Sequence, residues 1–222
     1  MYKILFIDEE KDAIDDFKDY VDETPASKNV EVLSEYPLND LDDMISLIIK
    51  INPDAIITDF MLNEHKVNIK YGVPYNGIEL VRNFTSIREG FPCFVMTSFD
   101  DDAVKQSDDV NIVYIKDILH SEKKTNVKAN FLEKVVSQIT HYKSKLENTE
   151  SELKKLLKLR DSGKATIADE EKIIELDNFL EKSIDKNNAI PKSYKQLSNT
   201  QRLEQILSKV DSLLQQVQKD EK

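Results

Sequence analysis

Three acidic side chains come directly after short apolar runs, where they could do chemistry together. Asp8 and Glu9 follow the first run, and Asp59 follows the third. Thr97 and Lys116 end two later runs and add a hydroxyl and an amine. Carboxylates that are forced together repel one another unless a hard cation neutralises them, and oxygen ligands from one or two carboxylates plus water suit Mg²⁺. These residue types therefore predict a magnesium site.

The same set of groups could transfer a phosphoryl group. A carboxylate beside a metal ion can attack phosphorus, while the metal ion, a hydroxyl and an ammonium neutralise charge on the transferring group. Asp59 is the expected nucleophile, because it directly follows an apolar strand that should be central in the sheet. The alternative is ordinary turn and capping chemistry, which is common for Asp after a strand and for Thr before a helix.

The elements that must position these groups alternate along residues 1 to 140. Short apolar segments predict five strands, and apolar residues at helical spacing between them predict helices. The strands are expected at 4–7, 30–33, 54–58, 94–96 and 112–115, with helices around 13–21, 41–48 and 78–84, the second of them stopped by Pro53. This alternation predicts an α/β fold with a doubly wound, five-stranded parallel sheet of flavodoxin-like type. Ligands of such sheets bind at the carboxyl ends of the strands.

Five segments in order resemble the receiver domain of two-component response regulators. They are Ile4–Glu10, Pro53–Asp59, Asn76–Leu80, Val95–Ser98 and Tyr114–Lys116. The resemblance implies that Asp59 accepts a phosphoryl group from a sensor histidine kinase or a phosphotransfer protein, and that Thr97 and Lys116 contact its oxygens. It implies four ligands for Mg²⁺: the side chains of Asp8, Glu9 and Asp59 and the backbone carbonyl of Met61. No enzymatic activity is expected beyond magnesium-dependent self-phosphorylation and dephosphorylation at Asp59.

The sequence departs from the receiver pattern at three positions near the site. Glu9 stands where the family usually has Asp. Asp117 replaces the proline that usually follows the lysine in a cis bond, so a trans peptide is expected after Lys116. Val113 occupies the place of the usual aromatic switch residue, and Tyr114, one residue later, should point to the opposite face of the strand.

The largest departure is an insertion at residues 63–76, where the family needs only a few residues. His65, Lys66, Lys70, Tyr71 and Tyr75 make it basic and aromatic within an acidic region. Loops near strand ends often carry function, so the insertion could shield the phosphoryl group or contact a partner. The alternative is a mobile surface loop.

Composition divides the 222 residues into two parts. The chain carries 31 Lys+Arg and 42 Asp+Glu for a net charge of −11, with 40% apolar and 33% charged residues, and residues 1–140 hold the negative excess. The longest apolar run, 45–49, is far too short for a membrane span, and no signal-peptide pattern opens the chain, so a cytoplasmic protein is expected. The single Cys93 excludes an internal disulfide. We expect a receiver domain at 1–142 and a helical output or dimerisation region at 143–222.

The second part has a helical apolar pattern. The last receiver helix is expected to continue through 132–160, followed by a turn at 161–165 and a second helix capped by Thr166 or Asp169. A third apolar series at 198–218 has the spacing of a coiled-coil seam. Either these stripes close a bundle within one chain, or helices 132–160 and 198–218 bind a second copy or a partner protein.

Four other functions are alternatives to the phosphoacceptor response regulator. The first is a degenerate receiver that serves as a constitutive scaffold, and the second is a DNA-binding transcriptional regulator. Nearly balanced charge after residue 140, with no basic stripe, argues against nucleic acid as a partner. A phosphatase of the haloacid-dehalogenase type would need an Asp-x-Asp pattern where the chain has Asp8-Glu9-Glu10, and a phosphotransfer bundle would depend on His141.

Overall fold

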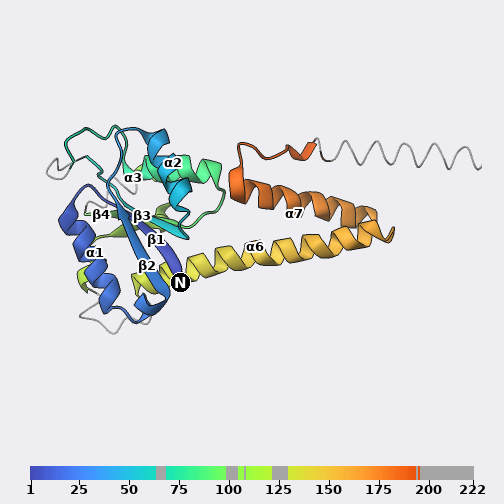
Figure 1. Cartoon of the computed structure of the whole chain (residues 1–222), viewed down its shortest axis with the longest axis horizontal. Helices are drawn as coiled ribbons and strands as arrows, with labels where there is room; N and C mark the ends of the chain where they lie inside the picture. The colour runs from blue at the N-terminus through green and yellow to red at the C-terminus, as the bar shows by residue number, and fades with distance from the viewer. Residues whose placement is uncertain (64–68, 99–104, 108, 122–129, 194, 196–222) are drawn as a thin grey trace, which may run out of the picture. The chain divides into compact units, whose positions relative to one another are not determined.

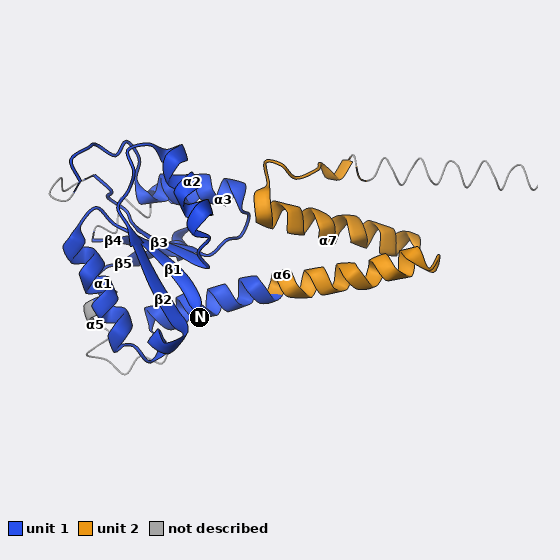
Figure 2. Ribbon diagram, viewed as in Figure 1, with its two compact units in different colours: residues 1–144 blue, residues 145–222 orange. Residues whose placement is uncertain are grey.

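The computed structural model describes residues 1–63, 69–98, 105–107, 109–121, 130–193 and 195 (Figure 1). The chain divides into two compact units, residues 1–144 and 145–222 (Figure 2). The whole apolar series at 198–218 lies outside the described residues. The assignment of a receiver domain to 1–142 and an output region to 143–222 stays a prediction.

The first unit contains one five-stranded parallel sheet with the order β2-β1-β3-β4-β5. Its strands are β1 (Tyr2–Ile7), β2 (Val30–Glu35), β3 (Ala55–Asp59), β4 (Cys93–Thr97) and β5 (Val113–Ile115). Every residue of β3 and β4 is buried, as expected for inner strands that are covered on both faces. The sheet confirms the predicted fold class, including the central position of the strand that ends at Asp59.

Helices cover both faces of this sheet (Figure 1). They are α1 (Lys11–Glu23), α2 (Leu41–Ile51), α3 (Gly77–Ile87), the short α5 (Ile118–Ser121) and the first part of α6 (Phe131–Asp161), with 3-10 turns at Pro25–Asn29 and Val110–Ile112. The Asp40 carboxylate caps α2 by accepting hydrogen bonds from the amides of Asp42 and Asp43. This helix ends at Ile51, and Asn52 adopts a left-handed conformation with φ 51° before Pro53, so the predicted stop is confirmed.

Two hydrophobic clusters hold the layers together. The first includes Leu5, Ile56 and Phe84 and lies between the sheet and the α2 and α3 side. The second lies on the α1 and α6 side, where Phe6 stacks on Phe17 at 4.3 Å and Phe131 begins α6. Buried side chains on both faces fix the strand register, because a slip by one residue would exchange the faces of every side chain. The carboxyl ends of the strands are therefore held at defined positions.

The second unit contains the later part of α6 and all of α7 (Ile167–Asp185). The helix α6 runs unbroken to Asp161, as predicted. It ends in a turn where Gly163 has a φ of 71° and the amide of Lys164 donates to the carbonyl of Leu159. Thr166 and Asp169 form a reciprocal capping box at the start of α7, so both predicted capping residues take part in one cap.

Candidate functional site

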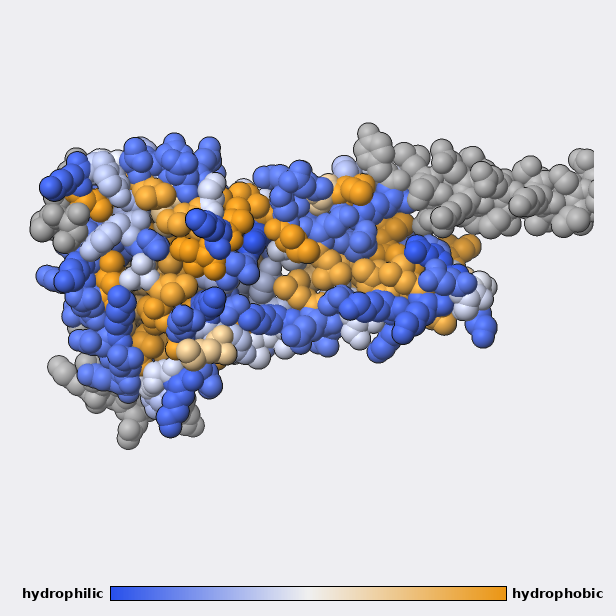
Figure 3. All heavy atoms as spheres, viewed as in Figure 1, coloured by the Kyte–Doolittle hydropathy of each residue, from blue (hydrophilic) through white to orange (hydrophobic). Residues whose placement is uncertain are grey.

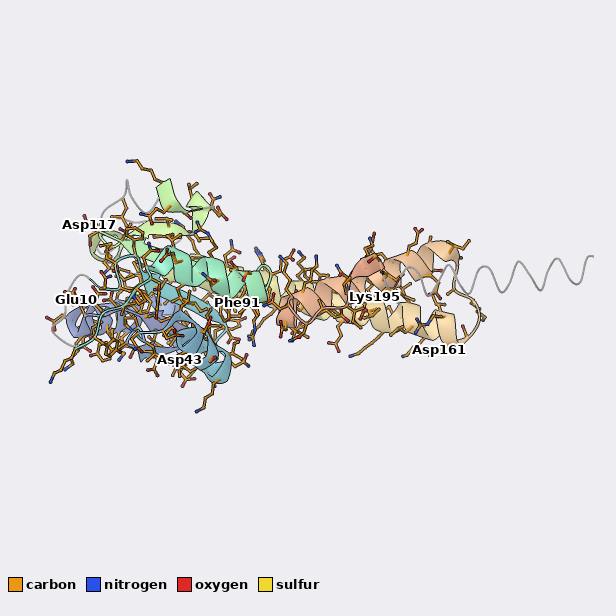
Figure 4. The ribbon with its side chains drawn as sticks, turned by 90° about the horizontal axis from the view of Figure 1, so that it is seen from above. Glu10, Asp43, Phe91, Asp117, Asp161 and Lys195 are labelled. Atoms are coloured by element: carbon orange, nitrogen blue, oxygen red, sulfur yellow. The ribbon has the colours of Figure 1, made fainter. Side chains whose placement is uncertain are left out.

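The site is built around the ammonium group of Lys116. Its Nζ atom lies 2.8 Å from Oδ1 of Asp59 and 3.1 Å from Oδ2 of Asp8. Asp8 follows β1, Asp59 ends β3 and Lys116 follows β5, so three strand ends contribute. Their neighbours Glu10 and Asp117 lie at the same end of this unit in Figure 4, while Phe91, which precedes β4, lies at the other. The topology thus brings together residues that are 108 positions apart in the chain.

Backbone groups hold the two carboxylates in place. The amide of Met61 donates to Oδ2 of Asp59 at 2.8 Å, and the amide of Glu10 donates to Oδ1 of Asp8 at 2.9 Å. Each carboxylate therefore meets both an amide and the Lys116 ammonium. The contact that Met61 makes with Asp59 is through its amide, and the expected metal-binding role of its carbonyl stays a prediction.

The start of α3 packs directly against the end of β3. The amide of Gly77 donates to the carbonyl of Phe60 at 2.9 Å. A Cβ atom at Gly77 would lie only 2.0 Å from the carbonyl oxygen of Asp59. Asn76 caps α3 in a reciprocal box with Glu79, so the helix start and the strand end form one tightly packed corner. This corner fixes the backbone that carries Asp59.

Glu9 is buried with one of its two carboxylate oxygens unpaired. Its side chain is 2% exposed, and its Oε2 is the one buried side-chain oxygen or nitrogen without a hydrogen-bond partner in the part of the chain that the structure describes. Burial raises the pKa of Glu9 to about 7, and the charges of Asp8 and Asp59 add to the rise, against a backbone hydrogen bond and Lys116. A buried carboxylate oxygen without a donor is costly unless a cation or a proton neutralises it.

The charges of Asp59 and Lys116 depend on each other. Burial raises the pKa of Asp59 to about 6, although Lys116 opposes the rise, and Asp8 contributes to it. Burial by itself would lower the pKa of Lys116, but the two carboxylates together outweigh it and raise this pKa above its ordinary value. At neutral pH Asp59 is therefore mostly ionised and Lys116 is protonated, as a nucleophilic carboxylate beside an ammonium requires.

The carboxylates of Asp8, Glu9 and Asp59 are suitable ligands for a hard cation, although they are not already arranged around a common point. Among the described residues, no group of three or more His, Cys, Asp or Glu side chains is arranged to hold a metal ion. Mg²⁺ usually takes only one or two protein carboxylates and keeps several waters. The unsatisfied oxygen of Glu9 and the two carboxylates that share Lys116 match this need. Binding of Mg²⁺ by Asp8, Glu9 and Asp59 remains a prediction.

Thr97 lies at the same edge of the sheet. It is the buried last residue of β4, next to the strand that carries Asp59. Its carbonyl accepts a 2.8 Å hydrogen bond from the amide of Lys116, so it helps to position the lysine backbone. The expected contact of the Thr97 hydroxyl with a phosphoryl oxygen stays a prediction.

The two departures in and after β5 have the expected structural effect. Val113 packs with the cluster on the α2 and α3 side, whereas Tyr114 packs with the opposite cluster. The Tyr114 ring lies 4.8 Å from that of Phe131 and 6.0 Å from that of Phe94. The opposite orientation of Tyr114 is therefore confirmed. No peptide bond among the described residues is cis, so the bond after Lys116 is trans as predicted.

The described part of the insertion is packed onto the first unit. Ile69, Val73 and Tyr75 are buried in the cluster on the α2 and α3 side. Two tyrosine hydroxyls donate to backbone carbonyls of the loop after β2, Tyr71 to Pro37 at 2.9 Å and Tyr75 to Leu38 at 2.7 Å. Residues 69–76 are thus packed onto this unit through their apolar and tyrosine side chains, while His65 and Lys66 lie outside the described residues.

The sequence reasoning missed this packing because it weighed the charged and aromatic residues of the insertion and not its apolar ones. Ile69 and Val73 were the available signal. The packed segment also borders a cavity of about 200 Å³ beside the Asp59 loop. Its lining residues are Met61, Leu62, Asn63, Pro74, Tyr75, Asn76 and Glu79.

Comparison with known proteins finds similar folds among solved structures. No protein-family model and no curated protein matches the sequence. The anti-anti-sigma factor PhyR from Bartonella quintana is 14% identical with a TM-score of 0.43, over 64% of this chain and 49% of that one. The response regulator domain of Thermotoga maritima CheB is 15% identical with a TM-score of 0.41, over 63% of this chain and 97% of that domain.

A structure of the two-component response regulator RcsB in complex with DNA is 15% identical with a TM-score of 0.39, over 82% of this chain and 91% of that one. This chain therefore spans about half the length of PhyR but nearly all of the CheB domain. All three are at most 15% identical, and all three TM-scores are below 0.5. The fold thus rests on the strand order described above, and a function must be argued from the site.

Proposed function

We propose that this protein is a phosphoacceptor response regulator in a histidine-to-aspartate phosphorelay. The observation that carries the proposal is the position of the Lys116 ammonium between the carboxylates of Asp8 and Asp59 at the strand ends. A buried aspartate that is ionised near neutral pH can act as a nucleophile. The ammonium of the lysine paired with it then balances the negative charge of the phosphorylated aspartate.

In the proposed step, an oxygen of Asp59 attacks the phosphorus of a phosphohistidine on the kinase or phosphotransfer protein. The new O–P bond forms as the P–N bond breaks, and the electron pair of that bond returns to the imidazole nitrogen. Lys116, already 2.8 Å from Asp59, pairs with the phosphoryl oxygens, and Thr97 donates a hydrogen bond to one of them. Positioned charges of this kind supply most of the catalysis in phosphoryl transfer.

The groups proposed to hold Mg²⁺ are the side chains of Asp8, Glu9 and Asp59 with the carbonyl of Met61. The ion, when bound, would neutralise charge on the transferring group. Glu9 supports this assignment, because its buried oxygen lacks a donor and its pKa is about 7. No activity on other substrates is proposed.

We infer that the output is association with proteins through the helical second unit. The unit presents apolar side chains on α6 and α7, and its sequence shows no clustered basic stripe of the kind that phosphate contacts need. None of the helices in the described part of the chain is both long enough and apolar enough to cross a membrane. A cytoplasmic location and a partnership with a histidine kinase belong to the same proposal.

Intact-mass measurement tests the nucleophile. The protein is incubated with Mg²⁺ and acetyl phosphate beside an Asp59→Asn variant, which keeps the side-chain shape but cannot form an acyl phosphate. We expect the wild type alone to gain one phosphoryl group, stable in acid and labile in base. An equal gain in both proteins would show that Asp59 is not the acceptor.

A constitutive scaffold is the second candidate function, favoured by the β5 geometry. Tyr114 is packed against the rings of Phe94 and Phe131, which also contact each other, and Val113 stands in the place of the usual aromatic switch. Conformational switching through this strand would then be lost. Absence of phosphorylation in the mass experiment, with Mg²⁺ present, would favour this candidate over the first.

A further inference from the structure

The loop after β3, at residues 60–63, carries the amide that contacts Asp59. This amide belongs to Met61 and donates to Oδ2 of Asp59 at 2.8 Å. The start of the loop is fastened by Phe60, whose amide donates to a carbonyl of β4 and whose carbonyl accepts from the amide of Gly77 in α3. Met61 lies in the middle of the loop, so its position also depends on how the far end is held.

The far end of the loop is held by the packed part of the insertion, residues 69–76, which we call the strap. The side-chain amide of Asn63 donates to the carbonyl of Val73, in the strap, at 2.8 Å. Leu62, before Asn63, is 1% exposed and belongs to the same hydrophobic cluster as the apolar residues of the strap. The loop and the strap are therefore joined by one polar contact and by packing.

The strap is itself fixed to another part of the first unit. The hydroxyls of Tyr71 and Tyr75 donate to the carbonyls of Pro37 and Leu38, at 2.9 and 2.7 Å. Both acceptors lie in the loop after β2, so the strap crosses between two loops at the carboxyl edge of the sheet. Because it is tied at this side as well, it can serve as a support for the loop after β3.

The packing between loop and strap is incomplete, which makes the contact of Asn63 important. The cavity of about 200 Å³ is lined by residues 61–63 of the loop and 74–76 of the strap, with Glu79 of α3. On the face that Figure 3 draws, hydrophilic side chains prevail at the end of the first unit that carries the strand ends, and hydrophobic ones gather nearer its middle. A loop at this end therefore depends on polar contacts as well as on packing.

We propose that Asn63 is a positioning residue, which ties the loop to the strap and so keeps the Met61 amide on Asp59. Its effect on the reaction rests on the proposed phosphoacceptor function. The net contribution of a hydrogen bond corresponds to about a two- to tenfold change in the population of an opened loop. In the opened loop the carboxylate of Asp59 keeps Lys116 but loses the amide that orients it, and a less oriented nucleophile reacts more slowly.

Nuclear magnetic resonance of the full chain follows the Met61 amide directly. Methionine labelled with ¹⁵N gives amide signals for Met61, Met44 in α2 and Met96 in β4, and the Met61→Leu variant identifies the first. Asn63 is exposed, so Asn63→Ala leaves no buried hole. In this variant we expect the Met61 amide proton to move upfield as it leaves the carboxylate. It should also exchange with solvent about two to ten times faster, while Met44 and Met96 stay unchanged.

Asn83→Ala is the matched control. The side-chain amide of Asn83 also donates to a backbone carbonyl at 2.8 Å, but that carbonyl belongs to Glu79 within α3 and not to the strap. This variant should leave the Met61 signal and its exchange rate unchanged. With Mg²⁺ and acetyl phosphate, the initial rate of phosphorylation should be about two- to tenfold lower in Asn63→Ala and unchanged in Asn83→Ala.

Three results would overturn the proposal. An unchanged Met61 signal in Asn63→Ala, or an equal change in Asn83→Ala, would show that Asn63 does not hold the loop. A changed Met61 signal with an unchanged phosphorylation rate would show that the loop does not orient Asp59 for reaction. The resonance measurement needs no phosphorylation, so it decides whether Asn63 holds the loop even if the wild type takes up no phosphoryl group. That failure would count against the proposed phosphoacceptor function instead.

Discussion

At the scale of single residues, Glu9 makes the stability of the protein depend on pH. Its folded-state pKa of about 7 lies above its ordinary value of 4.5, so the folded state holds a proton more tightly than the unfolded state. Without divalent cations, the stabilising effect of this proton is full at pH values below about 4.5 and is lost as the pH rises through about 7.

Replacing Glu9 with Gln should therefore stabilise the protein at alkaline pH. At pH 8 in the presence of a chelator, we expect Glu9→Gln to raise the free energy of unfolding by about 1–3 kcal/mol, with little change at pH 5. Urea denaturation at both pH values measures this, and added Mg²⁺ should stabilise the wild type more than the variant. Equal stabilities at pH 8 would contradict the buried, unsatisfied state of Glu9.

Lys116 should set the pH range in which Asp59 reacts. Burial raises the pKa of Asp59 to about 6 and Lys116 opposes that rise, so removing the ammonium should raise this pKa further. We expect phosphorylation by acetyl phosphate to decline as the pH falls through about 6 in the wild type. In the Lys116→Met variant, the phosphorylation rate should decline at a higher pH, and it should be lower than that of the wild type at every pH. A pH profile of the initial rate measures both, and an unchanged midpoint would mean that Lys116 does not act on Asp59.

The residues that meet in space were predictable to different degrees. Asp8, Asp59 and Lys116 could be expected to converge, because parallel topology places all carboxyl strand ends at one edge. The isolated oxygen of Glu9 and the amide contact of Met61 could not, since they depend on side-chain rotamers and on how the loop after β3 folds. Such details follow from packing and not from residue order.

At the scale of elements, the close packing of α3 against the end of β3 depends on a glycine, Gly77, which has no side chain. A Cβ atom at Gly77 would lie 2.0 Å from the backbone oxygen of Asp59, whereas one at Gly90, where φ is +75°, would meet nothing within 4 Å. We expect Gly77→Ala to destabilise the protein by about 2–4 kcal/mol through this backbone clash. Gly90→Ala, as a matched control, should cost only about 1 kcal/mol for its left-handed conformation.

Thermal unfolding of both alanine variants measures the difference, and the phosphorylation rate adds a functional reading. Because the clash falls on the backbone that carries Asp59, Gly77→Ala should also slow phosphorylation, which Gly90→Ala should not. Equal losses of stability in the two variants would show that the close approach of α3 to β3 is not as tight as described.

The packing of the insertion at residues 63–76 could not be predicted from its own sequence. Its charged and aromatic residues suggested an exposed loop with an open role, yet Ile69, Val73 and Tyr75 are buried beside the Asp59 loop. Their burial depends on contacts with Leu62 and with the loop after β2. Such contacts between distant parts of the chain cannot be predicted from a local sequence pattern. By contrast, the capping box at Thr166 and Asp169 was foreseeable, because a cap is a local interaction.

At the scale of the whole molecule, the charge distribution limits the partners. The net charge is −11, and acidic and basic residues are interspersed in the helical region. A DNA-binding surface gains its affinity by releasing counterions from phosphates through clustered Lys and Arg, and binding then weakens steeply with salt. A strongly acidic molecule without such a cluster pays an electrostatic cost on approaching DNA.

We therefore expect no salt-sensitive binding of this protein to duplex DNA. Fluorescence anisotropy with labelled DNA of mixed sequence, at about 50 and 200 mM salt, measures this in the untreated and the acetyl phosphate-treated protein. At the lower salt concentration, binding should be no stronger than the ~100 µM limit typical of weak non-specific contacts. Tight binding that weakens by a factor of ten or more at the higher salt would assign the output to nucleic acid. The helical unit would then have to present its lysines on one surface.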